Sequence, residues 1–174
     1  MGSMIDYSQD GGRRFYCKYN DKKYYLASHR YYSKDKFDDD STLLIVHKDP
    51  WFHGENFTCD YFSNGICLYY KDNRDGMRNW MLYIHKQSNN DYFIPMFHRS
   101  KCSKFILETI DDTKYFYIKE TQNNVYLYMN EAQKRDDNSY YVGATSEKNK
   151  ATRFKYIDII KKWFNFFQSY INYI

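Results

Sequence analysis

Residues 114–159 read KYFYIKETQNNVYLYMNEAQKRDDNSYYVGATSEKNKATRFKYIDI, four short runs of aromatic and β-branched residues separated by polar segments. The runs are Tyr115–Lys119, Val125–Met129, Tyr140–Ala144 and Arg153–Asp158. The separating segments, residues 121–124, 134–138 and 146–150, are rich in Asn, Asp, Ser and Lys, which is typical of turns and loops. This pattern predicts four consecutive β-strands.

Two landmarks of this stretch recur earlier in the chain with one period. Ile45, Ile94 and Val142 are 49 and 48 residues apart. Three phenylalanines show the same spacing, with steps of 48 and 49 residues: Phe57, Phe105 and Phe154. Two independent positions with one period indicate a threefold internal repeat.

The first and second runs also have earlier partners once loop lengths vary. The first runs are residues 15–18, 66–70 and 115–118, and the second runs are residues 24–27, 80–83 and 125–128. Three repeats of four strands give twelve strands, and in this respect the sequence resembles the β-trefoil superfamily. That resemblance implies a six-stranded barrel capped by three hairpins, with repeats at about residues 13–62, 65–110 and 114–159 of a single domain, residues 13–159.

Composition supports an all-β fold of one domain. The 174 residues include 21 Tyr and 13 Phe but only 2 Pro. Aromatic residues favour strands and bury large areas. The formal net charge of +4 is too small to indicate a nucleic-acid partner.

The two ends of the chain are expected to lie outside the repeats. Residues 1–4 are typical of an expression scar and are left out of the fold prediction. Residues 160–174 place apolar side chains on one helical face and predict a C-terminal amphipathic helix. We expect this helix to pack on the barrel of a monomer, with a dimer interface or membrane-surface contact as alternatives. No apolar run is long enough for a transmembrane segment.

The four cysteines do not form a metal-binding pattern. They lack CxxC spacing, and four cysteines allow three disulfide pairings. Cys59 and Cys67 flank a predicted turn and could lie near one another, and free buried thiols are the alternative. The sequon Asn56-Phe57-Thr58 weakly favours secretion.

No catalytic motif is present in the sequence. GxSxG, HExxH, Walker and GxGxxG patterns are absent, and the five histidines lack metal-ligand spacing. We therefore predict a recognition module without enzymatic activity, cofactor or metal.

Polar clusters recur five residues before Ile45, Ile94 and Val142, beside aromatic residues. Asp and Asn at such positions often only form turns, but acceptors beside aromatic rings also suit a sugar. The predicted glycan site comprises Asp40, Trp51, His53, Asn89, Tyr92, Asp137, Asn138 and Tyr140.

The superfamily resemblance implies several kinds of partner. Ricin-B-type lectins bind glycans, but their Gln-x-Trp signature is absent here, so this hypothesis rests on the fold alone. Trefoils similar to fibroblast growth factors bind heparin through a basic cluster in the third repeat, and others inhibit proteases or bind actin. The basic residues here are Lys134, Arg135, Lys148, Lys150, Arg153 and Lys155. The first expectation is that the chain binds a glycan or glycoprotein. The second is that it binds a protein, as a protease inhibitor, a secreted effector or toxin component, or an actin-binding protein.

Overall fold

The computed structural model describes residues 12–28, 33–49, 55–72, 76, 78–88 and 92–158. The predicted C-terminal helix, residues 160–174, lies outside the described residues. The strands are β1 (Arg13–Tyr19), β2 (Lys22–Ser28), β3 (Lys36–Asp38), β4 (Ser41–His47), β5 (Thr58–Phe62), β6 (Gly65–Asp72), β7 (Arg78–Lys86), β8 (Phe93–His98), β9 (Phe105–Thr109), β10 (Phe116–Glu120), β11 (Val125–Asp136), β12 (Ser139–Thr145) and β13 (Lys155–Asp158). Two 3₁₀ turns complete the described part, η1 (Ser33–Asp35) and η3 (Lys148–Lys150). No helix in this part is long and apolar enough to cross a membrane.

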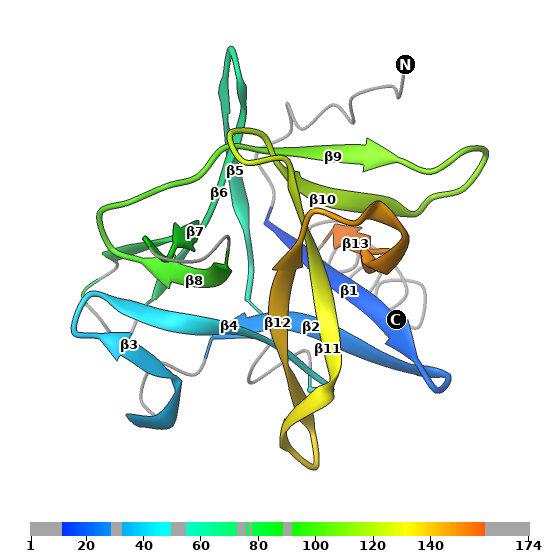
Figure 1. Ribbon diagram of the computed structural model, residues 1–174, viewed down its shortest axis with the longest axis horizontal. Helices are drawn as coiled ribbons and strands as arrows, with labels where there is room; N and C mark the ends of the chain where they lie inside the picture. Colours follow the sequence, from blue (N-terminus) through cyan, green and yellow to red (C-terminus); the bar gives the residue numbers. More distant parts are fainter. Residues whose placement is uncertain are drawn as a thin grey trace, which may run out of the picture.

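Antiparallel pairing closes eight strands into a ring (Figure 1). The order is β4-β8-β7-β6-β9-β10-β11-β12, and β12 pairs with β4 to complete it. Strands β2, β1 and β13 extend the sheet from β4, while β3 and β5 pair with β4 and β6. Closure satisfies backbone groups that an open edge would expose.

The predicted β-trefoil is therefore wrong: the described residues form an all-β closed barrel of eight antiparallel strands. The sequence pattern located most of the strands but not β3, and it assumed that only six strands close the ring. The ladder from Ser139–His47 to Tyr141–Ile45 joins β12 to β4, and Ser41–His98 to Leu43–Met96 joins β4 to β8. These two pairings place strands in the ring that had been predicted to form capping hairpins.

The periodic phenylalanines belong to the buried core. Phe57, Phe105 and Phe154 are all fully buried. Phe57 exchanges backbone hydrogen bonds with Arg13, Phe154 exchanges them with Phe116, and Phe105 pairs with Ile66. Large buried rings at these positions fill much of the core.

The same recurrence extends to the backbone beside these rings. The amides of Glu55, Ser103 and Thr152 donate to the carbonyl oxygens of Leu26, Leu82 and Leu127 at 3.0, 3.1 and 3.1 Å. The three leucines are almost fully buried. The boundaries assigned to the repeats remain predictions.

A buried ion pair fixes the segment between β2 and β4 to the barrel. Arg135 Nη2 lies 2.7 Å from Asp35 Oδ2, and both side chains are almost completely buried. Tyr141 donates from its hydroxyl to Asp35 Oδ1 at 3.0 Å. Burial, followed by the interaction with Asp35, raises the pKa of Tyr141 to about 12, which keeps this phenol protonated and able to donate at neutral pH.

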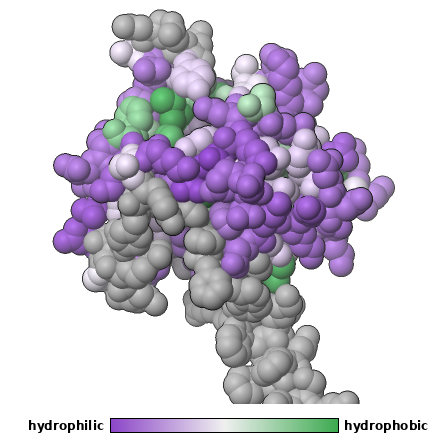
Figure 2. Space-filling view, turned by 90° about the horizontal axis from the view of Figure 1, so that it is seen from below, coloured by the Kyte–Doolittle hydropathy of each residue, from purple (hydrophilic) through white to green (hydrophobic). Residues whose placement is uncertain are grey.

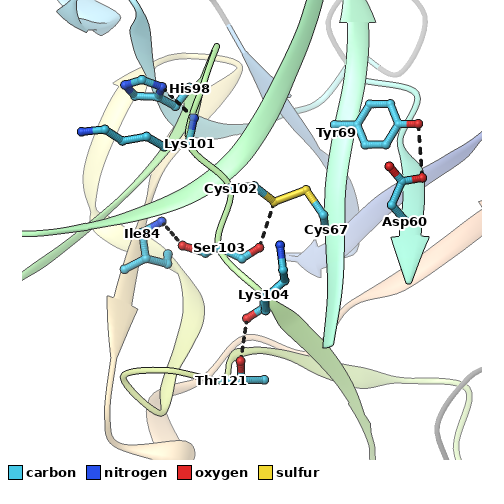
Figure 3. Close-up of a disulfide and its surroundings, with 10 residues drawn as sticks. All are labelled: Asp60, Cys67, Tyr69, Ile84, His98, Lys101, Cys102, Ser103, Lys104 and Thr121. Carbon is cyan, nitrogen blue, oxygen red and sulfur yellow. Dashed lines mark hydrogen bonds between the residues drawn. A yellow bond between two sulfur atoms is a disulfide. The ribbon is translucent and has the colours of Figure 1, made fainter. Parts of the chain in front are cut away.

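A disulfide joins Cys67 of β6 to Cys102, in the segment before β9 (Figure 3). Beside it, the Ile84 amide donates to Ser103 Oγ at 2.9 Å and Thr121 Oγ1 donates to the Lys104 carbonyl at 3.2 Å. Cys59 and Cys67 do not form a disulfide with each other. Cys59 pairs with Leu68 and packs against the core, whereas Cys67 is bonded to Cys102. Cys17 and Cys59 are free, and burial raises the pKa of each thiol to about 12.

We expect thiol titration to separate these two classes of cysteine. Denatured, unreduced protein should react with two equivalents of a thiol reagent, and reduced protein with four. The native protein should react slowly, because buried thiols with raised pKa values contain little thiolate. Four reactive thiols without reduction would contradict the disulfide.

Candidate ligand-binding groove

A groove of about 550 Å³ opens where the first and last described strands meet the β9–β10 turn. Its volume lies within the usual range for ligand sites. We call it the tyrosine–lysine groove, and its lining residues are Tyr16, Thr109, Thr113, Lys114, Tyr115, Lys155 and Tyr156.

Strand pairing brings together residues far apart in the chain. Tyr16 of β1 pairs with Lys155 of β13, and Phe15 pairs with Tyr156. Successive residues of a strand point to opposite faces, so Tyr16 and Lys155 share one face of the sheet while Tyr156 shares the face of the buried Phe15. Thr109 ends β9, and the turn that follows it contributes Thr113, Lys114 and Tyr115.

The β9–β10 turn is held by its own hydrogen bonds. Thr113 Oγ1 donates to the Ile110 carbonyl at 2.9 Å and accepts from the Tyr115 amide at 3.1 Å. Asp112 has a φ of 50°, in the left-handed region that Asp tolerates better than most residues. These bonds fix the backbone that carries Lys114 and Tyr115, so this rim of the groove is preorganised.

Each of the three lining tyrosines has a cation over its ring. Lys23 Nζ lies 4.8 Å from the Tyr16 ring centroid and Lys155 Nζ lies 4.1 Å from that of Tyr115. Arg13 Cζ lies 5.0 Å from the Tyr156 centroid. Cations at these distances are attracted by the ring quadrupole, so positive charge is held close to the aromatic surface.

The core supports two of these rings. Tyr156 makes aromatic contacts with Phe15 and Phe116, at centroid distances of 6.3 and 6.1 Å. Tyr16 contacts Tyr25 at 5.7 Å. Because Phe15 and Phe116 are fully buried, Tyr156 is attached to the rigid interior.

The chemistry of the groove favours an anion. Each lining side chain carries a hydroxyl or an ammonium group, the Thr113 hydroxyl already donating to Ile110, and the described lining holds no carboxylate. Burial, then Tyr115 and Tyr25, raises the pKa of Tyr16, so this phenol remains a donor at neutral pH. A ligand rich in acceptor oxygens would match this lining.

The described residues of the predicted glycan site lie at separate places in the fold. Asp40 and Asp137 lie near opposite ends of β4, since Ser41 begins β4 while Ser139 pairs with His47 at its end. Tyr140 packs against Tyr19 and Tyr24, with centroid distances of 5.7 and 5.5 Å. Trp51, His53 and Asn89 lie outside the described residues, and Tyr92 is 58% exposed.

Two of the polar clusters form turns. Asp38 Oδ1 accepts from the Asp40 amide at 2.8 Å, and Asp136 Oδ1 accepts from the Asn138 amide at the same distance. Such bonds are the turn-forming use of Asp. The remaining members contact cations, with Asp40 at 3.7 Å from Arg99 and Asp137 at 3.1 Å from Lys134. The assignment of a ligand to these residues remains a prediction.

The six residues of the predicted basic cluster do not form one patch. Lys134, Lys148 and Lys150 pair with Asp137, Glu108 and Glu147, and Arg135 is buried against Asp35. Of the remaining two, Arg153 is exposed and Lys155 lines the groove. Carboxylates therefore pair with four of the six basic residues that the sequence had suggested for binding an anionic glycan.

Lys155 is the one groove residue that the sequence had nominated for a ligand. Two Lys-Tyr pairs, Lys114-Tyr115 and Lys155-Tyr156, were the available signal. Their importance depends on the pairing of β1 with β13, which no local pattern reveals.

The remaining described surface offers small apolar areas. Figure 2 shows a mostly hydrophilic face with separate hydrophobic patches. The exposed large hydrophobic residues are Phe37, Tyr61, Phe62 and Tyr92. No group of His, Cys, Asp and Glu in the described part could hold a metal ion.

Comparison with known proteins supports the fold alone. No family model and no curated protein matches the sequence. The solved structures include a similar chain, a salivary protein from Culex quiquefasciatus that belongs to the Cysteine and Tryptophan-Rich (CWRC) family. Its TM-score is 0.58 at 16% identity, over 90% of this chain and 99% of that chain. The lectin prediction, which rested on analogy with trefoil lectins, therefore loses its basis.

Proposed function

We propose that this chain is a secreted, non-enzymatic module that binds a partner protein through the tyrosine–lysine groove. The observation that carries this proposal is the lining itself: three tyrosines and two lysines at a preorganised site, with no carboxylate among the described lining residues. Tyrosine supplies large contact area at low entropic cost and is enriched in protein interfaces. We infer that the partner presents an acidic segment.

Two further observations support secretion. A disulfide joins β6 to the segment before β9, and disulfides persist mainly in oxidising compartments. The structurally similar CWRC protein is described as salivary. Glycan binding has less support, because the residues nominated for it lie at separate turns.

The proposed binding can be tested with acidic and basic peptides of equal length. We expect fluorescence anisotropy to show binding of an Asp- and Glu-rich peptide and no binding of the Lys-rich peptide. Lys155→Gln should weaken binding by about tenfold or more, because it removes a cation that would contact the ligand. Affinity should also fall as salt screens the charges.

Lys150→Gln is the matched control. Lys150 is exposed on η3, pairs with Glu147 at 2.9 Å and does not line the groove. This variant should bind like the wild type. Equal loss in the two variants would indicate non-specific attraction to a basic surface and contradict a role for the groove.

A further inference from the structure

We propose that the groove holds an aromatic side chain that carries a tetrahedral oxyanion, as in sulfated or phosphorylated tyrosine. This inference rests on the proposed function and names the group that anchors the partner protein. It follows from the donor arrangement, the absence of a guanidinium fork from the described lining, and the three tyrosine rings.

The donors come from three separate segments of the chain. Tyr16 belongs to β1, and Lys155 and Tyr156 belong to β13. The third segment is the end of β9, at Thr109, with the turn that follows it. A sulfate or phosphate ester directs three strong acceptor oxygens outward, so it can accept from several sides at once. A carboxylate has only two acceptor oxygens, which lie in one plane.

The cations of the lining are also suited to this ligand. Lys114 and Lys155 provide ammonium groups, which act as compact point charges without a preferred plane. Planar recognition of a carboxylate usually relies on the arginine fork, and the described lining contains none. A tetrahedral anion loses less than a carboxylate when the fork is missing.

The rest of the ligand must match the aromatic part of the lining. Tyr16, Tyr115 and Tyr156 belong to this lining, and Tyr156 packs on Phe15 and Phe116. Aromatic pairs prefer offset or edge-to-face arrangements. A ligand ring between these tyrosines would direct its ester group toward the ammonium groups.

Calorimetric titration of four peptides tests the inference. The peptides share one acidic sequence and differ at the central residue, which is tyrosine, sulfotyrosine, phosphotyrosine or glutamate. We expect at least one of the two esters to bind about tenfold more tightly than the glutamate and tyrosine peptides. The preference between sulfate and phosphate identifies the source of the oxyanion.

Variants establish whether the gain arises in the groove. Lys114→Gln and Lys155→Gln should each remove most of the ester's advantage, whereas Lys150→Gln should retain it. Tyr156→Phe keeps the ring and removes a donor, so it should reduce the advantage without unfolding the protein. An ester advantage unchanged in all three groove variants would overturn the inference.

Competition experiments separate the aromatic ester from other anions. Phenyl phosphate or phenyl sulfate should displace the bound peptide at lower concentration than inorganic phosphate or sulfate. Equal displacement by the inorganic ions would overturn the role of the ring. Stronger displacement by a heparin fragment would overturn the inference in favour of a sulfated glycan.

The outcomes distinguish this inference from the proposed function. If all four peptides bind equally and Lys155→Gln weakens each of them, the inference fails while the acidic partner is retained. If none binds, both fail.

Discussion

Replacing Phe57 with Ala is expected to lower the free energy of unfolding by about 3–5 kcal/mol. The ring is fully buried and contacts Phe15, Tyr70 and Phe97 at centroid distances of 5.4, 6.3 and 5.8 Å. Removing it loses transfer free energy and leaves a cavity that neighbouring rings cannot fill. Urea unfolding measures the change, and Phe105→Ala and Phe154→Ala should show similar losses.

Tyr92→Ala is the control for this series. Tyr92 is aromatic but 58% exposed, so its replacement should change stability by no more than about 0.5 kcal/mol. A loss below about 1 kcal/mol for any of the three phenylalanines would contradict their common role in the barrel interior.

Replacing Arg135 with Ala is expected to cost about 3–5 kcal/mol, because it leaves the Asp35 carboxylate buried without its cation. Arg135 is 3% and Asp35 0% exposed, and Nε of Arg135 donates to both carboxylate oxygens at 3.0 and 2.9 Å. The bond between Tyr141 and Asp35 cannot compensate for the lost charge. Thermal and urea unfolding give the loss.

A double variant separates the ion pair from simple loss of packing. Asp35→Leu with Arg135→Met removes both charges and retains apolar volume, so it should be more stable than Arg135→Ala. Lys134→Ala, which breaks an exposed pair with Asp137, should cost no more than about 1 kcal/mol. Equal losses for Lys134→Ala and Arg135→Ala would contradict the special role of the buried pair.

The positions of strands could be predicted from the sequence, whereas the closure of the barrel could not. Residues 125–129 and 140–144 fall within β11 and β12 because alternating aromatic and β-branched residues favour half-buried strands. Closure depends on β12 meeting β4, about a hundred residues earlier in the chain. A hydrophobic pattern selects which face of a strand is buried but not which distant strand lies beside it.

The candidate site was difficult to predict for a related reason. Recurrent Asp and Asn indicated polar turns, and Asp38 and Asp136 show that these residues stabilise the turns themselves. The groove joins Tyr16 to Lys155 through one strand pair. Each residue is unremarkable in its own segment, so only the folded chain reveals the combination.

Chemical-shift mapping tests most directly whether the tyrosine–lysine groove is the binding site. An acidic peptide containing sulfotyrosine or phosphotyrosine would be titrated into isotope-labelled protein while backbone amide signals are followed. We expect saturable shifts concentrated at Tyr16, residues 109–115 and residues 155–156, with little change at Asp40 or residues 137–140. Shifts concentrated at those turns, or none in the groove, would contradict the assignment of binding to this groove.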